Sequence, residues 1–198
     1  MKQFVLIVVI LWSWQVKAQE LNMENELKRV FLNLPITESS QAVIEELKKQ
    51  HAEGWATKIP GTEWWIDQYK KDYKQHPPFD CTKAQLSFKK EPTLPREKLP
   101  NSIVDCFEIH LTLFFENQTK ADEAYDALQE QWRKLATRTE RELTRDKDYE
   151  PKEEFTCFYF DKTVDVPMFS LSRNRTNKNK KKEAVVIVGY TNCIISEK

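Results

Sequence analysis

The clearest pattern of apolar and polar positions lies in the second half of the chain. Residues 104–115 (VDCFEIHLTLFF) alternate strictly, which is the period-two pattern of a strand with one buried face. Residues 119–137 then place apolar side chains at helical spacing, and Thr119 or Asn117 can cap this helix. Short apolar runs predict three further strands, over 154–160, 167–173 and 184–191.

The first half of the chain is predicted to be mainly helical. Apolar side chains recur at helical spacing over residues 20–34 and over 39–52, where Thr37 or Ser39 can cap the second helix. A third helix is predicted over 62–75, because three aromatic residues recur there at every fourth position. These residues are Trp65, Tyr69 and Tyr73.

The order of these elements, together with a short strand over 86–88, predicts an α+β fold with two layers. We expect an antiparallel sheet of about four to five strands with helices packed on one face, because that arrangement needs only short connections. We expect residues 19–80 to form an N-terminal helical segment and residues 81–198 an α/β sandwich region in one domain, although the sequence leaves open whether residues 19–80 form a separate unit.

The first eighteen residues are typical of a cleaved signal peptide. Lys2 supplies a positive start, residues 4–12 are apolar, and residues 16–18 (VKA) have the small–x–small form of a cleavage site. The apolar run is shorter than the roughly 20 residues that span a bilayer, so it predicts no transmembrane anchor. The mature protein is therefore expected to be secreted or periplasmic.

The charge balance excludes one class of partner. The chain has 31 basic and 31 acidic residues, whereas a nucleic-acid-binding protein would carry a positive excess. A basic run over residues 173–182 could meet an anionic surface, although a solvated hairpin tip explains it more simply.

Four cysteines follow the predicted signal peptide: Cys81, Cys106, Cys157 and Cys193. An even number in an exported chain predicts two disulfides, and three connectivities are open. Pairing Cys81 with Cys106 and Cys157 with Cys193 is favoured, because each bond would join neighbouring segments. The chain has no CxxC pair, which argues against a zinc site.

The sequence predicts no catalytic residue, metal or cofactor. Three glycines are too few for a phosphate-binding loop or a dinucleotide fingerprint. Glu108 and His110 share the polar face of the longest predicted strand and could act as an acid–base pair, but solvent-facing positions explain both. His76, Asp80 and Cys81 are close enough in sequence to suggest a metal, which an oxidised cysteine would prevent.

The best functional lead is a cluster of aromatic residues. Exposed tryptophan and tyrosine anchor protein interfaces, because they bury a large area at a low entropic cost. They also stack on sugar rings, so a glycan is a second ligand class for this cluster. The alternative is that these rings fill the core beneath the sheet. The candidate binding residues are Trp55, Trp64, Trp65, Tyr69 and Tyr73.

Two segments match the N-glycosylation sequon. They are Asn117-Gln118-Thr119 and Asn174-Arg175-Thr176. Both matter only to a chain that passes through a eukaryotic secretory pathway.

Residues 34–47 (LPITESSQAVIEEL) resemble the opening helix of small periplasmic α/β modules, such as the lipoprotein component of the outer-membrane assembly machinery or the β-lactamase inhibitor proteins. The resemblance rests on the capping pattern and implies architecture only. The sequence as a whole predicts an exported, non-catalytic binding protein whose ligand is another protein, in an immunity, inhibitor or envelope-interaction role. The alternatives are a hydrolase acting on an envelope polymer and a structural envelope component.

Overall fold

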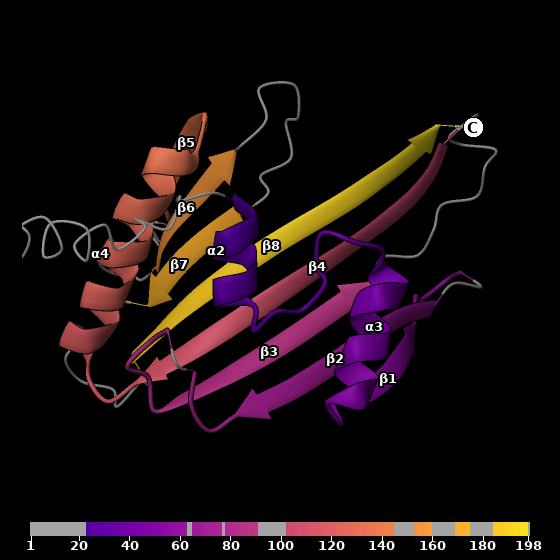
Figure 1. The fold of residues 1–198 in the computed structure, drawn as a ribbon, viewed down its shortest axis with the longest axis horizontal. Helices are drawn as coiled ribbons and strands as arrows, with labels where there is room; N and C mark the ends of the chain where they lie inside the picture. The colour runs from indigo at the N-terminus through magenta and orange to yellow at the C-terminus, as the bar shows by residue number, and fades with distance from the viewer. Residues whose placement is uncertain are drawn as a thin grey trace, which may run out of the picture.

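Eight antiparallel strands form one continuous sheet in the described part of this computed structural model (Figure 1). The structure describes residues 23–62, 65–76, 78–90, 102–144, 153–159, 169–174 and 184–197, and the predicted signal peptide lies outside them. The helices are α2 (Met23–Val30), α3 (Ser40–Lys49) and α4 (Gln118–Leu135). The strands, in their order across the sheet, are β1 (Glu53–Lys58), β2 (Trp65–Tyr73), β3 (Lys83–Lys90), β4 (Ser102–Phe115), β8 (Ala184–Glu197), β7 (Phe169–Asn174), β6 (Glu153–Tyr159) and β5 (Arg138–Thr144).

The chain builds this sheet in two halves of the same topology. Helix α3 precedes the meander β1–β2–β3–β4, and helix α4 precedes the meander β5–β6–β7–β8. Consecutive strands lie side by side in each meander, which is the usual arrangement of strands that follow one another in the chain. The halves meet where β4 pairs antiparallel with β8, from Ser102 opposite Glu197 to Phe115 opposite Ala184. This repeat of topology is not evident in the residue pattern.

The predicted two-layer α+β fold, with a sheet of about four to five strands covered by helices, is wrong, because the described residues form a single eight-stranded antiparallel sheet with few helices. The predicted helix over 62–75 is largely strand β2. A spacing of four residues returns to the same face of a helix, but as an even number it also returns to the same face of a strand. Residues 19–80 therefore contribute two strands, β1 and β2, to the same sheet as the rest of the chain.

The edge strands β1 and β5 are absent from the sequence-based prediction. Their sequences, EGWATK and RTERELT, contain few apolar residues and show no alternation. A strand with so few apolar residues lacks the period-two signal on which prediction depends.

One face of the sheet carries the core, and the described helices lie against it (Figure 1). At its centre Ile109 lies opposite Tyr190 and Leu111 opposite Val188, and all four side chains are buried. Because side chains alternate along a strand, Glu108 and its even-numbered neighbours on β4 point to the opposite face, called here the open face. The helices add buried residues, namely Val43, Ile44 and Leu47 of α3 and Ala121, Tyr125, Leu128 and Trp132 of α4.

Two of the candidate capping residues begin the longer helices. The Ser39 hydroxyl accepts the backbone N–H of Ala42 at 3.2 Å, and the Asn117 side chain accepts that of Lys120 at 3.0 Å. Each bond satisfies one of the free N–H groups in the first turn of its helix.

The predicted disulfide pairing is wrong. Cys81 and Cys157 are not disulfide-bonded, whereas Cys106 is. Cys193 is the remaining cysteine of the chain and lies directly opposite Cys106 in the β4–β8 ladder. Sequence separation does not reveal this relation, because the sheet brings together strands that are far apart in the chain.

A buried carboxylate holds the short helix α2 in place. Glu26 is 3% exposed and accepts hydrogen bonds from the Trp132 indole Nε1 at 3.2 Å and from the Gln131 side-chain amide. Arg29 adds an ion pair with Glu26 at 2.9 Å from the same helix. A helix of eight residues is marginal on its own in water, so its position depends on such contacts.

His76 joins α2 to the segment between β2 and β3. It is 1% exposed, and its Nε2–H donates to the Val30 carbonyl at the end of α2, at 2.8 Å. Its Nδ1 has no hydrogen-bond partner within the described residues. Burial lowers the pKa of His76 below its ordinary 6.5, and the nearby Arg29 guanidinium acts in the same direction, against the bond to Val30. Burial therefore favours the neutral form of the ring.

Replacing the buried carboxylate is expected to destabilise the fold. Glu26→Ala should lower the free energy of unfolding by about 2–3 kcal/mol, because the buried Trp132 indole and the Gln131 amide lose their acceptor. Urea denaturation measures the change. Glu123→Ala, at an exposed position on α4, is the matched control and should change stability by less than about 0.5 kcal/mol. A Glu26→Ala loss as small as that of the control would contradict this account of α2.

His76 should also make stability depend on pH in a defined window. Because its folded-state pKa lies below 6.5, the unfolded chain binds the proton first as pH falls. Its contribution is full above pH 6.5 and declines below it by at most about 1.4 kcal/mol per pH unit, until the folded-state pKa is passed. Urea denaturation between pH 5 and 7 measures this slope.

A matched pair of variants isolates the contribution of His76. His76→Gln should flatten the slope. His51→Asn, at an exposed histidine with φ of 58°, should leave it unchanged, because asparagine tolerates that conformation. An equal slope in the wild type and in His76→Gln would show that other groups cause it.

Candidate functional site

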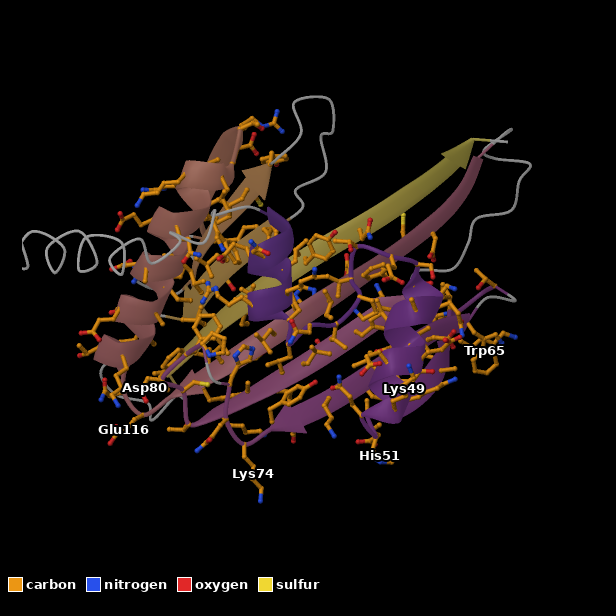
Figure 2. The ribbon with its side chains drawn as sticks, viewed as in Figure 1. Lys49, His51, Trp65, Lys74, Asp80 and Glu116 are labelled. Carbon is orange, nitrogen blue, oxygen red and sulfur yellow. The ribbon has the colours of Figure 1, made fainter. Side chains whose placement is uncertain are left out.

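The β1–β2 hairpin forms one edge of the sheet and carries two exposed indoles. β1 lies at the end of the strand order, and all six of its residues are exposed. Trp55 is 42% and Trp65 is 56% exposed, and within the described residues these are the exposed large hydrophobic side chains. Trp55 lies opposite Gln68 and Trp65 opposite Lys58, so the two indoles are on opposite faces of the hairpin. Figure 2 shows Trp65 at the rim of the molecule, beyond α3.

The five predicted binding residues do not form one surface. Trp55 and Trp65 are exposed, whereas Tyr69 and Tyr73 are partly buried and pack against the core. Trp64 lies outside the described residues. The sequence therefore locates the exposed indoles, but its helical interpretation groups them with tyrosines that support the hairpin from within.

Tyr69 fixes β1 to the rest of the sheet through a glycine. Gly54 lies directly opposite Tyr69, and a Cβ at Gly54 would stand 2.6 Å from the Tyr69 ring. The absence of a side chain lets the ring lie across the strand. On its other side this ring contacts Phe88 of β3, with 6.1 Å between the ring centroids.

The base of the hairpin is attached to the end of α3. The Tyr73 hydroxyl donates to the Gln50 side-chain oxygen at 2.9 Å, and the Lys71 ammonium donates to the Gln50 carbonyl. The positive charge of Lys71 at this position also interacts favourably with the negative end of the dipole of α3. Burial raises the pKa of Tyr73 to about 12, with a contribution from Glu46. These contacts give the exposed indoles a rigid support.

The two edges of the sheet differ in charge. The opposite edge, β5, has the sequence RTERELT, with a charged residue at four of its seven positions. β1 has the sequence EGWATK, with charges only at its two ends. Charged side chains on an edge strand discourage pairing with another strand. The middle of β1 lacks this protection.

A second group of polar residues lies on the open face around Gly189. This glycine of β8 lies between His110 of β4 and Ser170 of β7. A Cβ on it would stand 2.3 Å from Ser170 Oγ and 3.2 Å from His110 Nδ1, so both side chains converge over its backbone. His110 Nε2 is 3.9 Å from Glu108 Oε2, and the two side chains are 45% and 42% exposed. That distance exceeds the roughly 2.6–3.2 Å of a hydrogen-bonded catalytic pair.

Ser170 is the member of this group that sequence reasoning misses. Nothing in the local sequence links it to His110, because only the strand order puts β7 beside β8 and β8 beside β4.

The residues suggested as metal ligands have other partners. His76 is bonded to the Val30 carbonyl, and Asp80 forms an ion pair with Lys120 at 3.0 Å. Burial raises the pKa of the Cys81 thiol, which disfavours the thiolate that metals bind. Within the described residues no group of three or more histidine, cysteine, aspartate and glutamate side chains is placed to hold a metal ion.

Arg173 does not belong to an exposed basic tip. Its side chain is 6% exposed and donates to Asp122 at 3.0 Å and to Asp126 at 3.2 Å, which attaches β7 to α4. The guanidinium also lies over the Tyr125 ring, 4.2 Å from its centroid. The remainder of the predicted run, 175–182, lies outside the described residues.

Comparison with protein-family models, with curated proteins and with solved structures finds no match to this chain. No helix in the described part of the chain is long and apolar enough to cross a membrane. The surfaces described above are therefore the features that can indicate a function.

The contact between Gly54 and Tyr69 can be tested by adding a side chain. Gly54→Val should lower the free energy of unfolding by about 1–3 kcal/mol, because the new Cβ overlaps the Tyr69 ring. Ala56→Val is the control, since it adds a branched side chain to the same face of the same exposed strand. It should be neutral or slightly stabilising. Equal stabilities of the two variants in urea denaturation would show that Tyr69 does not pack over Gly54.

Proposed function

We propose that this chain is an exported, non-catalytic binding protein whose ligand is another protein, and that it binds through the β1–β2 edge. The observation that carries the proposal is the pair of exposed indoles, Trp55 and Trp65, on an edge strand without charges in its middle. Tryptophan is enriched among the residues that dominate protein interfaces, because burying an indole removes a large apolar area from water.

The geometry of the edge supports a protein ligand over a small molecule. An exposed edge strand offers unpaired backbone N–H and C=O groups, which an extended segment of a partner can bond. The indoles on the two faces of the hairpin would then contact side chains above and below the added strand. The contacts of Tyr69 and Tyr73 hold the hairpin in place beforehand, which lowers the entropic cost of binding.

The proposal retains the predicted secreted or periplasmic location and the predicted non-catalytic binding role. The chain would act in the periplasm or outside the cell, as an inhibitor, an immunity protein or a partner in an envelope complex. The leading alternative is a hydrolase that acts on an envelope polymer, with the group around His110 as its site. The convergence of Ser170 and His110 over Gly189 favours it, but the separation and exposure of Glu108 and His110 give it less support.

Removing an exposed indole should weaken binding and leave the fold intact. Trp55→Ala and Trp65→Ala are each expected to raise the dissociation constant of the partner by about 30-fold, which corresponds to about 2 kcal/mol. The partner is first captured with tagged residues 19–198 from the native envelope or extracellular fraction, and is then titrated by calorimetry. The melting temperature of each variant should match the wild type, because these side chains are exposed.

Two further variants separate the edge from the rest of the surface. Ala56→Lys puts a charge in the middle of β1, as β5 has, and should also weaken binding. Thr139→Ala, at an exposed position on β5, should not change it. Unchanged affinity in all the β1–β2 variants would remove this edge from consideration. Recovery of the chain without a partner would contradict the binding proposal and would make the group around His110 the first site to test for hydrolase activity.

A further inference from the structure

Asn117 uses only one end of its side-chain amide within the fold. It occupies the turn between β4 and α4 with extended backbone angles, φ −153° and ψ 168°. Its Oδ1 accepts the backbone N–H of Lys120 at 3.0 Å and so caps α4. Among the described residues its Nδ2 makes no hydrogen bond, and the residue is exposed. The structure thus leaves the amide nitrogen available on the surface.

The same asparagine begins the sequon Asn117-Gln118-Thr119. Its threonine is also exposed, in the first turn of α4. A sequon that is exposed in the folded protein can carry a glycan without burying it. We propose that Asn117 is an N-glycosylation site, with a polyprenyl-diphosphate-linked oligosaccharide as the donor. The proposal rests on the proposed export of the chain, and it applies where that export runs through a eukaryotic secretory pathway.

The reaction changes only the unused end of the side chain. A bond forms between Nδ2 and the first sugar carbon, the bond from that carbon to the diphosphate breaks, and one amide proton passes to solvent. Oδ1 remains an amide carbonyl oxygen and can still accept from Lys120. Glycosylation and helix capping are therefore compatible at the same residue.

The position of Asn117 also leaves the proposed binding edge uncovered. Figure 2 shows Glu116, the preceding residue, at the end of the molecule opposite Trp65. A glycan beside Glu116 would project away from the β1–β2 hairpin. Glycosylation at this site does not conflict with the proposed function, and either proposal can fail without the other.

The site can be tested by translating the full chain, residues 1–198, with endoplasmic-reticulum microsomes. The translocated chain should be protected from added protease and should lose mass on treatment with endoglycosidase H. Thr119→Ala and Asn117→Asp should each abolish the loss of mass that is due to a glycan on Asn117. Asn174→Gln should retain that loss of mass. A chain that is protected from protease but shows no loss of mass that depends on Thr119 would overturn the proposal. Failure of translocation would also overturn it, because the side chain would never meet the transferase.

Three variants distinguish the glycan from the cap, using unglycosylated protein. Asn117→Asp and Thr119→Ala should leave the melting temperature unchanged, since aspartate also caps helices. Asn117→Ala should lower it by about 2–4 °C through loss of the cap. The natural protein provides the final readout. Release of its glycans by peptide:N-glycosidase in ¹⁸O water should convert Asn117 to labelled aspartate, and an unmodified Asn117 in the exported chain would reject the site.

Discussion

The ladder between β4 and β8 is the constraint on which the rest of the structure depends. It joins two halves that each consist of a helix and a four-stranded meander, and it aligns buried pairs such as Leu111 with Val188. Without it each meander would present a long apolar edge to water, which favours aggregation. On β4 the ladder continues beyond the last residue that pairs with β3, Phe107. Cys106 and Cys193 are paired residues of this ladder just beyond that boundary.

The helices complete the core on one face, and the shortest of them depends on polar contacts. α3 and α4 place apolar stripes against the sheet, whereas α2 has eight residues and little stability of its own. Glu26 and His76 compensate by fixing the middle and the C-terminal end of α2 through buried hydrogen bonds. Buried polar groups of this kind are costly when a partner is lost. The packing of α2 therefore depends on pH through His76, whereas that of the apolar core does not.

The sequence predicts those parts of the fold whose pattern is local. Alternation identifies β4, and capping residues with apolar stripes identify α3 and α4. Prediction fails where the decisive information is not local. The spacing of Tyr69 and Tyr73 fits a helix and a strand equally, and the sequences of β1 and β5 contain too few apolar residues to show a period. The partners of Cys106 and Arg173 are set by strand order, which no single segment encodes. The exposed tryptophans could be located by residue type, but only the register separates them from the tyrosines.

The contrast between the two edges gives the binding proposal its physical basis. Both β1 and β5 end the same sheet, so both face the same risk of unwanted strand pairing. β5 carries charged residues along its length, which discourage such pairing. β1 is uncharged in its middle, and the β1–β2 hairpin carries two exposed indoles. An edge strand without charges can pair with other chains, which lowers solubility, and its exposed residues contribute nothing to the core. Its presence at one end of the sheet alone is best explained by a partner that covers it.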